Sequence, residues 1–199
     1  GFEIISKTKQ TIFAKNVSGQ KHEEFDTLLR RVFMLILEMG SECYKAVAAG
    51  NFDELEAIAK MDDDVNRHVN FCRRTLNTIG HRVVKRVAPT YYLVEQLERT
   101  GDCYKLLCKR VSEAKPVPKK WMNDLLADAN VFVRRFYELY YKFSLQDLAE
   151  FWKEKEKIEK NIASALEAAS KKELAAVFAI SEIVSNIADA NGALLTARL

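Results

Sequence analysis

The sequence predicts an all-α protein, and three observations lead to this fold class. Only seven glycines and three prolines occur among 199 residues, while hydrophobic residues make up 48% of the chain and charged residues 30%, which is typical of a folded helical protein. Apolar residues recur at intervals of three and four along most of the chain, which is the spacing of one helix face. The interruptions of this pattern contain glycine or proline, residues that commonly end helices.

The N-terminal segment departs from the helical pattern. Phe2–Val17 alternates weakly between polar and apolar residues, carries β-branched side chains and is followed by Ser18 and Gly19. Alternation of this kind predicts a short strand or a hairpin. Residues 1–20 are therefore expected to form a strand-like or linker segment ahead of the helices.

Three helices are expected in residues 21–115. The first covers residues 21–49, because its apolar positions share one face, and Gly50 follows where a glycine commonly ends a helix. The second covers residues 52–80 and carries its acidic side chains in its first half. The third covers residues 89–113 and opens at a proline, which is tolerated in the first turn of a helix.

A linker and three further helices complete the chain. Two prolines in Ala114–Trp121 remove backbone donors and restrict the residues before them, so the helical pattern breaks there. Beyond this linker, a fourth helix reaches Phe143, a fifth covers residues 146–168 and a sixth covers residues 171–197. A second three-helix repeat is accordingly expected at residues 119–199, with the boundary between the two halves at the prolines.

The two halves show a faint internal repeat. One constant offset aligns apolar residues of the second and fifth helices, and after a small deletion the third and sixth helices align as well. The aligned positions are, in order, Leu55 with Leu148, Val65 with Ile158, Val69 with Ile162, Leu97 with Val184, Asp102 with Asp189 and Leu107 with Leu194. Each half is therefore predicted to be a three-helix unit that packs beside the other.

Composition narrows the cellular setting and the classes of partner. The net charge of +3 comes from 31 basic and 28 acidic residues spread along the chain, so charge alone does not indicate nucleic acid. The four cysteines form no C-x-x-C pair, which disfavours disulfide and zinc scaffolds and suits a reduced, cytoplasmic protein. The longest apolar runs, such as Val32–Leu37, are far shorter than the ~20 residues that cross a bilayer, so no membrane insertion is expected.

Two segments rich in acids carry a family resemblance. They are "MDDDVNRHV" (Met61–Val69) in the second helix and "VEQLERTGDCYKLL" (Val94–Leu107) in the third. Together they resemble the PhoU family, regulators of phosphate uptake built as two three-helix bundles. The recurring family motif, E(D)xxxD, lies on the second and third helices of each repeat, where metal clusters can bind. Glu98 and Asp102 match the third-helix motif in full.

The remaining motif positions match the family less completely. Asp62 matches the first acid of the second-helix motif, and Asn66 stands at the position of the second acid. The corresponding positions of the second repeat are Lys155, Glu159, Ser185 and Asp189. Half of the acids are absent there, so the resemblance implies one metal site, in the first repeat, formed by Asp62, Asn66, Glu98 and Asp102.

The spacing of Glu98 and Asp102 suits cation binding by itself. Residues at i and i+4 stack on one helix face about 6 Å apart, so both carboxylates can reach one hard cation. If Asp62 and Asn66 face the same groove, four oxygen donors converge. Such a donor set suits magnesium, calcium, manganese or iron better than zinc.

A plainer interpretation of the two third-helix acids is a surface charge pair. Their mutual repulsion would then be offset by a neighbouring cation, and Arg99, Lys105 and Arg67 are the local candidates. Gly101 lies between the two acids although glycine in mid-helix costs about 1 kcal/mol relative to alanine. It therefore indicates either close helix packing or an open approach for a cation.

The function favoured by these residues is regulatory rather than catalytic. No Glu-x-x-His pair, phosphate-binding glycine loop or nucleophile–base pair can be identified in the sequence. From the resemblance to the PhoU family we expect a cytoplasmic, homodimeric adaptor of phosphate uptake or signalling, with a divalent metal or iron as cofactor and a phosphate transporter, its ATPase or a sensor kinase as partner. The alternatives are a metal-dependent helical enzyme and a DNA-associated transcriptional regulator. Two features bear on the DNA-associated alternative. Some archaeal PhoU-like chains carry an upstream β-rich DNA-binding domain. In addition, the stretch between Val65 and Val94 is basic and free of acids, so it could bind anions.

Overall fold

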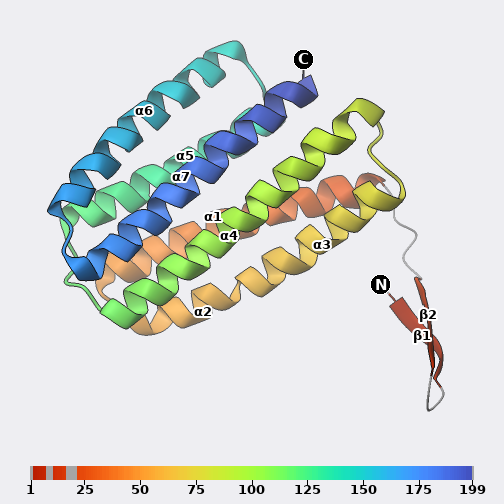
Figure 1. The fold of residues 1–199 in the computed structure, drawn as a ribbon, viewed down its shortest axis with the longest axis horizontal. Coiled ribbons are helices and arrows are strands. Elements are labelled where there is room, and N and C mark those ends of the chain that lie inside the picture. The colour runs from red at the N-terminus through yellow and green to blue at the C-terminus, as the bar shows by residue number, and fades with distance from the viewer. Residues whose placement is uncertain (1, 8–10, 17–21, 199) are drawn as a thin grey trace.

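The computed structural model describes residues 2–7, 11–16 and 22–198, most of which are helical (Figure 1). The α-helices are α1 (His22–Ala49), α2 (Leu55–Lys60), α3 (Asp62–Thr78), α4 (Val87–Ala114), α5 (Lys120–Tyr141), α6 (Leu145–Ala168) and α7 (Lys171–Arg198). Two short 3-10 helices, η1 (Phe52–Glu54) and η2 (Val84–Arg86), precede α2 and α4. The predicted all-α class is confirmed. Over the described residues, none of the helices combines the length and the apolar character needed to cross a membrane.

A β-hairpin precedes the helices. Strand β1 (Phe2–Lys7) pairs antiparallel with β2 (Ile12–Asn16), and the register is irregular between Ile4 and Ser6. The expected strand or hairpin is thus confirmed within the described residues. Residues 17–20 of the predicted N-terminal segment lie outside them.

The predicted helix over residues 52–80 is wrong as a single element, because the chain turns at Met61 between α2 and α3. The Met61 N–H donates to the Ile58 carbonyl at 3.1 Å, and the Asp64 N–H donates to the Met61 carbonyl at 3.1 Å. These bonds span three residues rather than four and tighten the backbone there. Three consecutive acids, Asp62–Asp64, then open α3, where the positive end of the helix dipole favours them. The other predicted helices agree with the structure to within two residues at their stated ends.

The helices form two groups that pack side by side (Figure 1). Helices α1, α3 and α4 contact one another, as do α5, α6 and α7, while α4 lies along α7 and α1 lies against α5. The buried apolar residues of both groups belong to one continuous core. Helix α4 ends at Ala114. The next residue, Lys115, has a left-handed φ of 41°, and the linker 115–119 leads to α5. This linker coincides with the predicted boundary between the repeats, and their independence as domains stays a prediction.

A polar contact inside the core ties the two groups together. The buried Tyr104 hydroxyl on α4 donates to Asn130 Oδ1 on α5 at 2.6 Å, and Asn130 Nδ2 donates to the Gly40 carbonyl on α1 at 2.8 Å. A Cβ atom on Gly40 would lie 2.6 Å from Asn130 Oδ1 and 2.8 Å from the tyrosine oxygen. Glycine is therefore required at this position of α1 for the three helices to meet.

Candidate functional site

The predicted site lies where α3 and α4 pack closely, and Gly101 sets that approach. A Cβ atom on this residue would lie 3.2 Å from Asp62 Oδ1 and 3.2 Å from Val65 Cγ1, both on α3. Both neighbours are fully buried. Of the two interpretations of this glycine, close helix packing is the one that the structure bears out.

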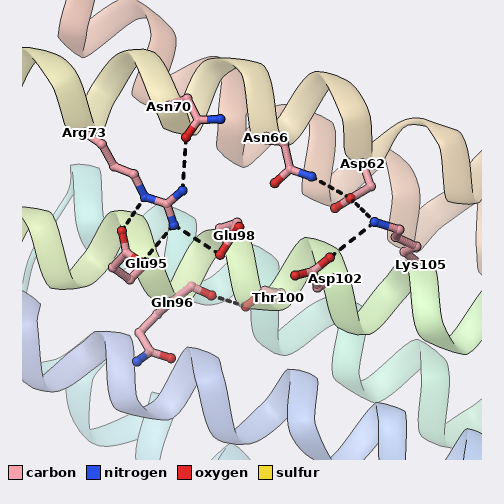
Figure 2. A network of polar contacts seen from close by, with 10 residues as sticks. All are labelled: Asp62, Asn66, Asn70, Arg73, Glu95, Gln96, Glu98, Thr100, Asp102 and Lys105. Carbon is pink, nitrogen blue, oxygen red and sulfur yellow. Dashed lines mark hydrogen bonds and ion pairs between the residues drawn. The ribbon is translucent and has the colours of Figure 1, made fainter.

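Asp62 is buried completely, which is unusual for a carboxylate unless it is paired. Its Oδ2 atom accepts hydrogen bonds from Asn66 Nδ2 at 2.8 Å and from Lys105 Nζ at 2.7 Å (Figure 2). Its Oδ1 atom is buried and has no hydrogen-bond partner in the described part of the chain. One carboxylate oxygen is therefore satisfied by the protein, and the other carries unused acceptor capacity.

Lys105 bridges the buried acid to the exposed one. Its Nζ also lies 3.5 Å from Asp102 Oδ1, and the Asp102 side chain is 53% exposed. The hydrogen bond to Asp62 is the main cause of a raised pKa for Lys105. The ammonium is therefore charged throughout the physiological range and offsets both carboxylates.

Glu98 lies on α4, farther along the contact with α3, and pairs with Arg73 of α3. Arg73 Nη2 is 3.2 Å from Glu98 Oε2, while its Nε and Nη2 atoms bond Glu95 at 2.5 Å and 2.8 Å. Asn70 Oδ1 accepts a further bond from Arg73 Nη1 at 3.2 Å. The two-point bond to Glu95 is the main cause of a raised pKa for Arg73. Figure 2 shows Arg73 and Lys105 at two separate positions along the contact between α3 and α4.

The structure thus places all four predicted site residues along the contact between α3 and α4, together with two protein cations. Among the described residues, Asp62, Glu95, Glu98 and Asp102 pair with Arg73 and Lys105, so these six side chains carry a formal charge of −2. Over the described residues, no three or more His, Cys, Asp or Glu side chains gather closely enough to form a metal-binding group.

Sequence reasoning identified one of these cations and missed the other. Lys105 was among the candidate counter-charges, whereas Arg67 pairs with Asp64 at 2.6 Å instead. The Arg73–Glu95 pair joins residues 22 positions apart. No local spacing rule predicts such a pair, because it depends on how α3 and α4 are placed against each other.

The second repeat builds nothing comparable at the corresponding positions. Lys155 and Glu159 form an ion pair of 2.5 Å within α6. Ser185 and Asp189 are exposed on α7. The two halves therefore share helix packing and differ in the polar groups that their second and third helices carry.

Comparison of the chain with models of protein families, with curated proteins and with solved structures gives no match. A function for this chain is consequently inferred from its sequence motifs and from the polar contacts between α3 and α4.

Proposed function

We propose that this chain is a PhoU-like, non-catalytic regulator or adaptor of phosphate uptake or phosphate signalling. The observation that supports the proposal is the contact between α3 and α4, where the motif residues Asp62 and Asn66 of α3 and Glu98 and Asp102 of α4 lie in the polar network of Figure 2 with Arg73 and Lys105. The arrangement of two neighbouring three-helix groups, with α4 along α7, adds support because it is the architecture that the resemblance implies. In this proposal the protein acts in the cytoplasm as a homodimer and contacts a phosphate transporter, its ATPase or a sensor kinase.

The second part of the proposal is a divalent metal or iron ion held between α3 and α4 by Asp62, Asn66, Glu98 and Asp102. Carboxylate and amide oxygens suit a hard cation. The unpartnered, buried Oδ1 of Asp62 supports a further ligand, since buried acceptors are normally satisfied. Lys105 already bonds two of these acids, so a metal ion would compete with its ammonium.

The regulatory role is tested in cells that carry this gene. Deleting the gene should change how the uptake of radiolabelled phosphate responds to phosphate supply, and the wild-type gene should restore the response. A chain with both Glu98→Gln and Asp102→Asn should restore it less well, while the matched second-repeat variant Glu159→Gln should restore it fully. Uptake that responds to phosphate identically with and without the gene would refute the proposal.

A further inference from the structure

A cavity of about 560 Å³ lies at one end of the molecule. None of the candidate site residues Asp62, Asn66, Glu98 and Asp102 lines it. It is lined by the start of α1, the connection between α3 and α4, the end of α5 and the end of α7. Figure 1 shows the start of α1, the start of α4 and the end of α7 toward the same side of the view. Its volume lies within the range of pockets that hold small organic ligands, about 300–1,000 Å³.

Four arginines line this cavity, and three of them have no acidic partner among the described residues. They are Arg30, Arg82, Arg86 and Arg198. Arg82 Nη2 is 4.0 Å from Glu23 Oε1, while the other three arginines form no ion pair with any acid in the described part of the chain. Asp26 is the acid in the lining, so these five residues carry a formal charge of +3. A concave site with one dominant sign of charge concentrates ions of the opposite sign.

Two of these arginines are held in place by main-chain carbonyls rather than by acids. Arg86 Nε donates to the Ala197 carbonyl at 2.9 Å, and Arg198 Nη2 donates to the Tyr140 carbonyl at 2.8 Å. Each bond uses one of the five donors of a guanidinium, so the rest stay available. The guanidinium of Arg30 lies 4.2 Å from the centre of the Tyr141 ring, a stacking contact that also leaves its donors free.

His81 adds a neutral donor to the same lining. The Val83 N–H donates to His81 Nδ1 at 2.9 Å, so the neutral ring carries its proton on Nε2. Burial lowers the pKa of His81, and the charge of Arg86 acts in the same direction. The ring is therefore neutral at pH 7.

The inner wall of the cavity is apolar. It is formed by Phe25, Leu29, Leu93 and Leu194, which are buried side chains of α1, α4 and α7. Cationic groups around an apolar wall match a ligand that has a charged part and a non-polar part. A phosphate offers several oxygens to several guanidiniums at once, which suits arginines that come from separate elements.

We propose that this cavity binds a small organic phosphate, with at least two negative charges bound by Arg30, Arg82, Arg86 and Arg198 and an apolar or aromatic body against Phe25 and Leu93. A nucleotide belongs to this chemical class. The proposal does not depend on the adaptor role or on the metal site. It assigns the basic stretch before α4 to a small ligand rather than to nucleic acid.

The proposal is tested by calorimetric titration of the full chain with ADP, inorganic pyrophosphate and orthophosphate. ADP should bind saturably at one site per chain, more tightly than pyrophosphate, and should bind more weakly as salt is raised. Arg30→Gln and Arg82→Gln should each weaken ADP binding tenfold or more, because each removes a charged donor. The control is Arg67→Gln, which removes the same charge from an exposed α3 arginine outside the lining and should leave ADP affinity unchanged.

The melting temperature of each variant shows whether the fold is intact, and a double variant, Arg30→Gln with Arg82→Gln, guards against compensation between the two. Absence of saturable ADP binding at millimolar concentration would overturn the proposal, as would an equal loss of affinity in the Arg67 control. If pyrophosphate binds as tightly as ADP, the part of the proposal that places an organic group against the apolar wall would be overturned. Duplex DNA that binds and is not displaced by ADP would overturn the small-ligand assignment in favour of nucleic acid.

Discussion

Lys105 Nζ lies 2.7 Å from Asp62 Oδ2, and this bond joins α4 to a carboxylate that is completely buried on α3. A charge taken out of water is costly unless an opposite charge and hydrogen bonds compensate it. Lys105 is 31% exposed, so its ammonium stays partly hydrated while it compensates the acid. The pair therefore fixes how α3 and α4 sit against each other, and a metal ion bound by Asp62 would have to compete with the Lys105 ammonium.

The first prediction follows from this dependence of Asp62 on one partner. Lys105→Met should lower the free energy of unfolding by about 2–4 kcal/mol, because it leaves the buried carboxylate with Asn66 alone. The control is Lys109→Met, at an exposed α4 lysine that forms no ion pair within the described residues. Urea unfolding of both variants measures the difference. Equal stability of the two variants would contradict the inference that buried Asp62 depends on Lys105.

The second prediction concerns the two glycines inside the third helices of the two halves. Gly101→Ala should destabilise the protein by about 1–2 kcal/mol, because the new Cβ would lie 3.2 Å from two fully buried side chains and we expect the strain of shifting them to exceed the helix preference of alanine. Gly192→Ala should stabilise it by about 0.5–1 kcal/mol, because no heavy atom lies within 4 Å and alanine favours helix. Thermal unfolding of the two variants should therefore move in opposite directions.

The third prediction concerns Glu173, whose side chain is 3% exposed near the start of α7. Burial raises the pKa of this acid, but the bonds from Lys119 Nζ at 2.9 Å and from the Ser170 N–H at 2.8 Å outweigh it, and the net pKa is lowered. A lowered folded pKa gives stability that is present above the unfolded value of 4.5 and is lost as pH falls through the folded value.

Glu173→Gln should therefore cost about 1–3 kcal/mol at pH 7, and the cost should shrink as the pH falls below 4.5. Chemical denaturation from pH 7 to pH 3 measures this. The matched control, Glu24→Gln at an exposed acid of α1 without an ion pair in the described residues, should change stability little at any pH. A cost for Glu173→Gln that does not vary with pH would show that packing, not ionisation, is lost.

Sequence patterns located the helices well because apolar spacing directly records which side of a helix faces the core. They failed at Met61, where the apolar pattern continues through a turn that only the backbone bonds reveal. They also did not predict that Asp62 is buried, since an acid on a helix is usually solvated. Its burial depends on the missing side chain of Gly101 and on Lys105, two features of α4 that spacing within α3 cannot report.

The last prediction concerns metal binding. It follows from the competition between the Lys105 ammonium and a metal ion for Asp62 and Asp102. If Asp62, Asn66, Glu98 and Asp102 bind a hard cation, removing one charged ligand should abolish most of the affinity. Glu98→Gln and Asp102→Asn preserve side-chain size and remove charge, so metal content measured by elemental analysis should fall in both. Lys105→Met should instead raise the affinity for manganese in calorimetry, because it removes the competing ammonium.

The second half supplies the controls for this prediction. Glu159→Gln and Ser185→Ala should leave metal content unchanged, since Lys155 already places a positive charge where a ligand would be needed. If the wild-type protein and Lys105→Met both take up no divalent metal and no ferric iron at millimolar supply, the metal site is refuted. Glu98 and Asp102 would then act as an acidic surface for a basic partner. Arg73 and Lys105 would offset part of the negative charge of this surface. Because docking would depend on the remaining charge, it would weaken with rising salt.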